Sequence, residues 1–227
     1  MDIENRSQLG PAGPVCGYAA MITVLSVTDL TLVRGERVLF RNLDLTLAAG
    51  EAVALTGANG AGKTSLLRAV AGFIRPEAGT VVFRDADDDA IDPPEARAHG
   101  LHLLGHLDGL KTARTARDEL MFQSQWLGHS HKGIEEAIAV LGLNPLLDLE
   151  VRKLSAGQRR RLALARLIGS PRALWLLDEP LSPLDARWRT VVGEIMARHL
   201  HGGGLILAAV HDSLPIPTRA LDLGAGR

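Results

Sequence analysis

The stretch Leu55-Thr56-Gly57-Ala58-Asn59-Gly60-Ala61-Gly62-Lys63-Thr64-Ser65 decides the fold of this chain. It contains the pattern G-x-x-x-x-G-K-[ST], which is typical of a phosphate-binding loop, or P-loop. Its glycines can take the positive φ angles that turn backbone N–H groups toward phosphate oxygens. Lys63 supplies a positive charge for the β- and γ-phosphates, and the Thr64 hydroxyl is expected to bind Mg²⁺. The predicted phosphate-binding residues are Gly57, Ala58, Asn59, Gly60, Ala61, Gly62, Lys63, Thr64 and Ser65.

The residues on either side of this loop fit the same interpretation. Residues 51–55 form a short apolar run suited to a buried strand, and residues 65–71 continue with helical character. The positive end of that helix would face the same anion. The pattern therefore predicts a strand, a glycine-rich loop and a helix in succession.

The composition is that of an ordinary globular protein. Of its 227 residues, 46% are hydrophobic and 22% are charged, and the formal net charge is −1. No basic excess favours a nucleic-acid partner. Apolar runs such as residues 205–210 are far shorter than the ~20 residues that cross a bilayer, so any membrane role is expected to need a partner. The single cysteine, Cys16, fits a reducing cytosol.

The first 22 residues are predicted to be a flexible N-terminal extension. They include acidic residues and prolines but no basic segment of the kind that begins a secretory signal. Met21 is a possible alternative start. The folded domain is therefore expected to span residues 23–227.

The rest of the chain alternates between strand and helix patterns. Alternating apolar residues predict antiparallel strands between Val24 and Leu47, and residues 80–83 predict a further strand. Helices are expected near residues 113–127, 133–142 and 145–150. The acidic run 85–92 is interpreted as a solvated loop and His129-Ser130-His131 as an exposed turn, although either could be considered for metal binding.

A second cluster, Leu154-Ser155-Ala156-Gly157-Gln158, marks the start of a long amphipathic helix. Its first amides could bind an anion, and Ser155 could equally be a simple N-cap. The next residues, Arg159-Arg160-Arg161, are predicted to form a solvated helix face.

A third cluster follows the apolar run 173–177, which predicts a buried strand ending at Asp178 and Glu179. Beside a P-loop, the first acid can hold Mg²⁺ and the second can orient or deprotonate a water molecule. Asp185 could cap the next helix. His211 ends the last predicted strand, a position where a lone histidine is usually structural.

These motifs in this order resemble the nucleotide-binding domain of ATP-binding cassette (ABC) transporters over about residues 23–227. The resemblance implies an α/β fold, a P-loop NTPase of ABC-ATPase type. That fold has a mixed core sheet with flanking helices, an antiparallel β subdomain and a helical subdomain, here at about residues 106–157.

The resemblance also implies a head-to-tail homodimer that encloses two ATP molecules. One subunit would contribute the P-loop, Mg²⁺ held by Thr64 and Asp178, the general base Glu179 and the γ-phosphate contact His211. The other would contribute its signature motif, and Asp185 would communicate across the interface. The signature residues are Ser155, Ala156, Gly157 and Gln158.

Two positions depart from the family pattern. Arg34 stands where many members have an aromatic residue that stacks on adenine, and a guanidinium plane can stack on a base as well. The usual glutamine after the core strand is missing, and His106 most nearly takes its place.

The segments Gly105–Thr112, Leu154–Arg161 and Leu174–Pro180 look most like the small ATP-binding subunits of bacterial haem exporters in system I cytochrome c maturation. That resemblance implies membrane permease partners and a peripheral location on the cytoplasmic face of the inner membrane. The alternatives are an ATPase subunit that exports a lipid, lipoprotein or drug, and a soluble ABC ATPase that acts on ribosomes or DNA. The lack of a basic excess argues against the soluble ATPase.

Overall fold

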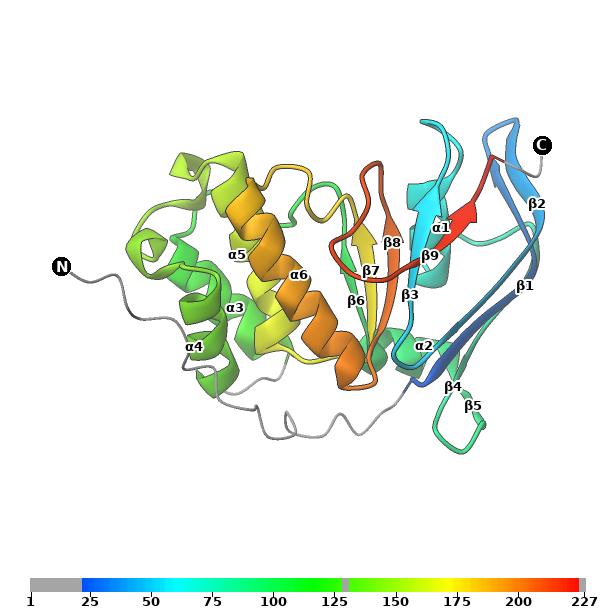
Figure 1. The fold of residues 1–227 in the computed structure, drawn as a ribbon, viewed down its shortest axis with the longest axis horizontal. Coiled ribbons are helices and arrows are strands. Elements are labelled where there is room, and N and C mark those ends of the chain that lie inside the picture. The colour runs from blue at the N-terminus through cyan, green and yellow to red at the C-terminus, as the bar shows by residue number, and fades with distance from the viewer. Residues whose placement is uncertain (1–21, 128–130, 225–227) are drawn as a thin grey trace.

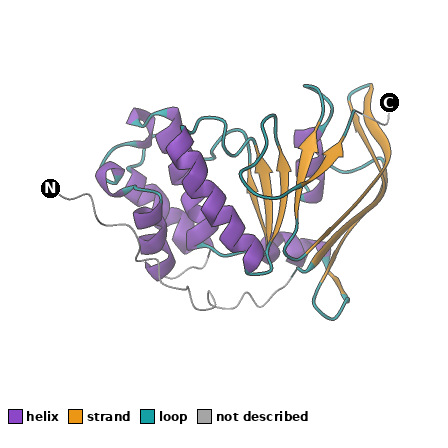
Figure 2. Cartoon of the chain, in the orientation of Figure 1, coloured by secondary structure: helices purple, strands orange, loops and turns teal. Residues whose placement is uncertain are grey.

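The fold was obtained as a computed structural model, which describes residues 22–127 and 131–224 (Figures 1 and 2). The predicted extension, apart from Ile22, and the His129 position lie outside the described residues. Antiparallel strands lie at one end, a parallel sheet in the middle and most helices at the other end (Figure 2).

The antiparallel sheet begins with the hairpin that the alternating residues predict. In sheet order its strands are β2 (Arg37–Ala48), β1 (Val24–Arg34), β4 (Ala78–Arg84) and β5 (Ala90–Ile91). The turn lies between Arg34 and Arg37, which pair across the hairpin. Arg34 is therefore held at the tip of this sheet.

The core sheet is parallel in every pairing of its strands. In sheet order these are β6 (Leu101–Leu104), β7 (Leu174–Asp178), β8 (Leu205–Ala209), β3 (Ala52–Thr56) and β9 (Arg219–Asp222). The predicted α/β class is confirmed. The core sheet is expected to be mixed, but it is parallel throughout, and the antiparallel pairings lie in the separate sheet. Because parallel strands point the same way, the segments that follow β3, β7 and β8 meet at one edge.

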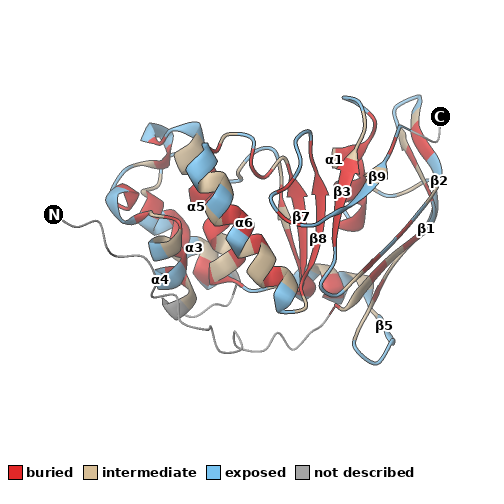
Figure 3. Ribbon diagram, viewed as in Figure 1, coloured by how far each residue is buried: buried red, intermediate tan, exposed pale blue. Residues whose placement is uncertain are grey.

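The inner strands β3, β7 and β8 of the core sheet are buried, which explains why they are continuous apolar runs, whereas the edge strand β9 is mostly exposed (Figure 3). Along β7, Leu174 and Leu176 pack with the cluster that joins the antiparallel sheet and the P-loop helix. Trp175 and Leu177 face the other way and pack with the helices that follow. The period-two alternation thus assigns each side chain to one of two cores.

Six α-helices surround these sheets within the described residues. They are α1 (Lys63–Val70), α2 (Pro93–Glu95), α3 (Ala116–Leu127), α4 (His131–Val140), α5 (Ala156–Gly169) and α6 (Ala186–His201). A five-residue π-helix, residues 96–100, follows α2. The helix expected near residues 145–150 is instead a pair of 3₁₀ turns, Asn144–Leu146 and Val151–Lys153. His131, which the sequence places in an exposed turn, is instead the first residue of α4.

The acidic run 85–92 forms the turn between β4 and β5 and includes β5 itself. The Asp85 carboxylate accepts hydrogen bonds from the backbone N–H groups of Asp87 and Asp89, both at 3.0 Å. This carboxylate thus stabilises the turn itself. Among residues 22–127 and 131–224, no helix has the length and apolar character needed to cross a bilayer.

Candidate nucleotide-binding site

The P-loop connects β3 to α1 as the sequence predicts. Gly57, Gly60 and Gly62 have φ angles of 120°, 77° and 106°, in the region that favours glycine. At Gly62 a Cβ atom would also lie 3.0 Å from the Phe40 ring, so a side chain is excluded for two reasons. Lys63 is 8% exposed, and its Nζ donates to the Gly57 carbonyl at 2.6 Å. The loop therefore holds its lysine folded against its own backbone.

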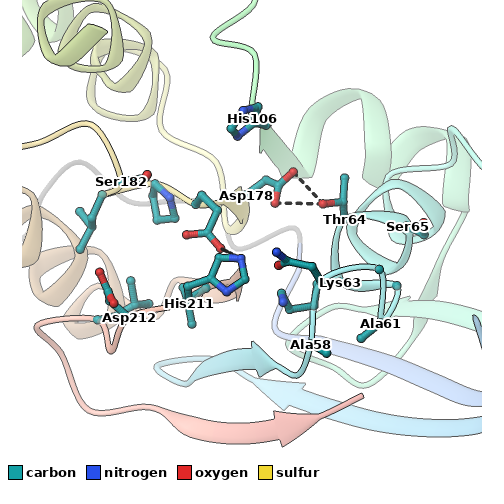
Figure 4. Close-up of a pocket in the computed structure, with 18 of the residues that line it drawn as sticks. Ala58, Ala61, Lys63, Thr64, Ser65, His106, Asp178, Ser182, His211 and Asp212 are labelled. Atoms are coloured by element: carbon teal, nitrogen blue, oxygen red, sulfur yellow. Dashed lines mark hydrogen bonds and ion pairs between the residues drawn. The ribbon is translucent and has the colours of Figure 1, made fainter. Parts of the chain in front are cut away.

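Thr64 and Asp178 meet across the space between α1 and β7. The Thr64 hydroxyl donates to the two carboxylate oxygens of Asp178, at 3.1 and 3.0 Å (Figure 4). Asp178 is 5% exposed. A hydroxyl and a carboxylate are oxygen ligands of the kind Mg²⁺ prefers, and Mg²⁺ takes its remaining ligands from phosphates and water. These two side chains therefore fit the predicted magnesium site.

Glu179 directly follows β7 in an unusual backbone conformation, with φ at 49°. Its N–H donates to the Ala209 carbonyl at 2.9 Å, which fastens it to the end of β8. Its Oε1 lies 3.5 Å from Nε2 of His211 and is buried with no hydrogen-bond partner among the described residues. A strained residue with an unsatisfied buried oxygen points to a functional role.

These groups surround one cavity of about 460 Å³. Figure 4 shows Lys63, Thr64, Asp178 and His211 around the same space. Residues 58–65 of the P-loop line it, as does Glu179. The exposed residues Arg34 and His106 also line the cavity, so the structure brings both unusual positions to the predicted site.

The signature motif lies outside this cavity. Ser155 is the N-cap of α5: its hydroxyl accepts from the Gln158 N–H at 3.2 Å, and the Gln158 side chain accepts from the Ser155 N–H at 2.8 Å. This capping box satisfies two donors at the helix end. A Cβ on Gly157 would lie 2.9 Å from the Pro183 carbonyl oxygen, so this glycine permits close packing. Asp185 caps α6 by accepting from the Trp188 N–H at 2.9 Å.

Sequence reasoning missed Arg189, which also lines the cavity. Its Nε donates to the Leu184 carbonyl at 3.1 Å, and its Nη1 lies 3.5 Å from a carboxylate oxygen of Asp212. It therefore connects the turn before α6 with the residue after His211. The only signal in the sequence was its place one helical turn after the Asp185 cap.

The prediction for the arginine run is wrong. Arg160 is 2% exposed and Arg161 is 9% exposed, so neither lies on a solvated helix face. Arg161 donates to the carbonyls of Leu141 and Gly142 and stacks over the Trp188 ring at 4.0 Å. Tertiary carbonyl acceptors, which a local charge pattern does not reveal, make this burial possible.

Residues 40–182 match the ABC transporter family. Because this match spans more than half of the sequence, the chain belongs to the ABC transporter family, which implies that it binds nucleotide.

Within that family, the similar curated proteins are cytochrome c biogenesis ATP-binding export proteins named CcmA. The protein from Rhodopseudomonas palustris (strain BisB5) is 46% identical, covering 88% of this chain and 98% of that protein. The Bradyrhizobium diazoefficiens protein is 43% identical over the same shares. The Maricaulis maris protein is 40% identical, covering 89% and 93%.

Solved structures resemble the fold at lower sequence identity. A putative ABC transporter ATP-binding protein from Pyrococcus furiosus has a TM-score of 0.76 at 20% identity, covering 88% of this chain and 98% of that one. A bacterial ABC transporter cassette solved as a dimer has a TM-score of 0.71 at 20% identity, covering 83% and 88%. These likenesses confirm the ABC ATPase fold.

Proposed function

We propose that this chain is the ATP-hydrolysing subunit of a membrane ABC transporter, the haem exporter complex of system I cytochrome c biogenesis. The observation that carries the ATPase part is the edge of the core sheet. There the P-loop, the acidic pair Asp178-Glu179 and His211 follow three adjacent parallel strands and line one cavity. The haem-export part is supported by the similarity to CcmA proteins.

The chain's own residues bind and orient the triphosphate. The P-loop amides and Lys63 would hold the phosphates, with Lys63 exchanging its Gly57 carbonyl for a phosphate oxygen. Thr64 and Asp178 would hold Mg²⁺, which supplies charge neutralisation for the transferring phosphoryl group. Arg34, at the tip of the antiparallel sheet, would stack on the base.

Glu179 would accept the proton of the attacking water as general base, and His211 would contact the γ-phosphate. Their side chains already lie 3.5 Å apart. Phosphoryl transfer depends mainly on positioning and on stabilisation of charge, which this arrangement supplies. His106, on the loop after β6, would act in place of the usual glutamine.

The site would be completed by a second copy of the chain. Ser155 and Gly157 lie at the start of a helix outside the cavity, and in this proposal they would bind a nucleotide held by another subunit. Asp185 would communicate between the two sites. A similar fold solved as a dimer supports this arrangement.

The membrane partners would be permease subunits that the ATPase joins at the cytoplasmic face of the bacterial inner membrane. None of the described helices crosses a bilayer by itself. No nucleic-acid partner is proposed, because the net charge is −1. Hydrolysis would power release of haem or a haem-loaded chaperone.

The ATPase assignment is tested by Glu179→Gln. This change keeps the size of the side chain and its contact with His211 but removes the base. We expect ATP binding to persist, steady-state phosphate release to fall by at least about 100-fold, and an ATP-bound dimer to accumulate in size-exclusion chromatography. Glu194→Gln, an exposed change on α6, is the matched control. Normal phosphate release from Glu179→Gln would overturn the assigned base.

The haem-export assignment has a separate test. Deleting the gene should abolish c-type cytochromes in the host, as measured by haem staining, and the gene carrying Glu179→Gln should fail to restore them. Normal c-type cytochromes after deletion would instead favour an exporter of a lipid, lipoprotein or drug.

A further inference from the structure

Arg160 connects three segments that are far apart in the sequence. Its Nη1 donates to the Gly105 carbonyl at 3.0 Å, and its Nη2 donates to the Glu179 carbonyl at 3.2 Å. The same Nη1 lies 3.2 Å from a carboxylate oxygen of Asp108. A single side chain on α5 therefore contacts both the loop after β6 and the backbone of the proposed catalytic base.

Burial makes these contacts consequential. The side chains of Arg160 and Asp108 are 3% and 19% exposed. Burial lowers the pKa of Arg160 and raises the pKa of Asp108, while each charge opposes the shift of the other. Removing one member of a buried pair leaves the other charge without compensation. The guanidinium is thus fixed in place by its surroundings.

Arg160 lies near the signature motif at the start of α5 and also contacts a residue that would act on the chain's own nucleotide. It lies within the first turns of α5, whose N-terminal residues Ser155 and Gly157 would bind the partner's nucleotide. Its Glu179 contact is to a residue with φ at 49°, a conformation that neighbouring contacts must maintain. Its other contact, Gly105, immediately precedes His106, which lines the cavity.

We infer that Arg160 is a positioning residue that fixes Glu179 and the loop containing His106 relative to α5, the helix that begins at the signature motif. The start of α5, which would bind the partner's nucleotide, is thereby linked through this guanidinium to the base that would act on the chain's own nucleotide. This inference rests on the proposed function, because it requires Glu179 to be the base and the signature to act in the partner's site.

Arg161 provides a matched control on the same helix. It is also buried and also donates to two backbone carbonyls, those of Leu141 and Gly142. Those residues and the Trp188 ring that it covers do not line the cavity. Loss of Arg161 therefore reports the cost of removing a buried arginine from α5 without disturbing Glu179.

The test compares Arg160→Gln with Arg161→Gln in the full chain. For Arg160→Gln we expect the dissociation constant for ATP to stay within about twofold, and the ATP-dependent dimer to form. We expect kcat to fall by at least about tenfold, since misplacing a catalytic group is costly even from a distance. For Arg161→Gln we expect a lower melting temperature but a kcat per folded molecule within about twofold of the wild type.

Two further variants keep the inference falsifiable if Arg160→Gln fails to fold. Arg160→Lys retains the charge and can reach part of the acceptor set, so it should recover part of the lost kcat. Asp108→Asn removes only the carboxylate partner and should lower kcat by about threefold with ATP affinity unchanged.

Wild-type kcat in Arg160→Gln and Asp108→Asn, alongside an inactive Glu179→Gln, would overturn this inference and leave the proposed function standing. An equal loss of kcat in Arg160→Gln and Arg161→Gln would also overturn it. Failure of the proposed function would appear separately, as normal turnover in Glu179→Gln.

Discussion

The two predicted nucleotide-binding motifs differ in how much of a binding site a single chain forms around them. The P-loop, residues 57–65, follows β3 of the core sheet, and its residues 58–65 line the 460 Å³ cavity. The signature motif, Ser155–Gln158, lies outside that cavity, and two donors at its helix end are satisfied by its own capping box. Both are helix N-termini with small residues, yet of the two only the P-loop lines that cavity.

This difference indicates which groups would supply the binding energy of each motif. If the proposed function holds, the P-loop would bind phosphate in a single molecule, because three neighbouring strand ends bring its partners together. The signature motif offers one helix end, and in the proposed arrangement the other groups of its site would come from a second molecule. Changes in the P-loop should therefore affect binding by the monomer, whereas changes in the signature should affect assembly.

The sharpest test of this comparison is Lys63→Ala. Loss of the charge that would contact the phosphates should weaken ATP binding by about 100-fold or more, measured by titration calorimetry on the monomer. Lys153→Ala is the control, because Lys153 is an exposed lysine that pairs with Glu150. Unchanged affinity in Lys63→Ala would show that the P-loop does not act as half of a preformed site.

The side of the core sheet that α5 and α6 cover also predicts a dependence of stability on pH. His199 of α6 stacks on Trp175 at a centroid distance of 3.7 Å, on the face of the core sheet that α5 also covers. Burial lowers the pKa of His199 to about 4, against 6.5 ordinarily. The unfolded chain therefore binds the proton more readily, and stability is lost as pH falls from about 6.5 toward 4.

We expect this histidine to remove about 2 kcal/mol of unfolding free energy between pH 7.5 and pH 5.0, measured by urea denaturation. The same loss should be absent in His199→Gln, whose side chain does not titrate. Identical pH dependence in the two proteins would show that His199 is not buried in its neutral form.

The smallest effect is expected from Ser155→Ala in the signature motif. Removing the N-cap should cost about 1 kcal/mol of stability. ATP affinity of the monomer should stay unchanged, and the ATP-dependent dimer should weaken in sedimentation experiments. A loss of monomer affinity comparable to that of Lys63→Ala would remove the distinction between the two motifs.

The local motifs could be predicted from the sequence because their chemistry is contiguous. A P-loop requires glycines and a lysine within a few residues, and an alternating run predicts the hairpin of β1 and β2. The strand-end placement of Asp178 and His211 followed from apolar runs of the right length.

What could not be predicted depends on partners distant in the sequence. Arg160 and Arg161 resemble solvent-exposed arginines in the local pattern, but carbonyls from other segments satisfy them in the interior. The segment 145–150 has helical composition but forms short 3₁₀ turns between α4 and α5. Arg189 belongs to the site because the two segments that it contacts, the turn before α6 and the segment after His211, lie close together in the fold.

The capping box at Ser155 has a consequence for the reversibility of assembly. A helix end that depended on a partner's phosphate for its hydrogen bonds would expose unsatisfied amides each time the subunits separated. Here Ser155 and Gln158 satisfy each other within one chain. These two donors therefore keep their partners when the subunit is alone, so the association and separation that we propose would not leave them unsatisfied.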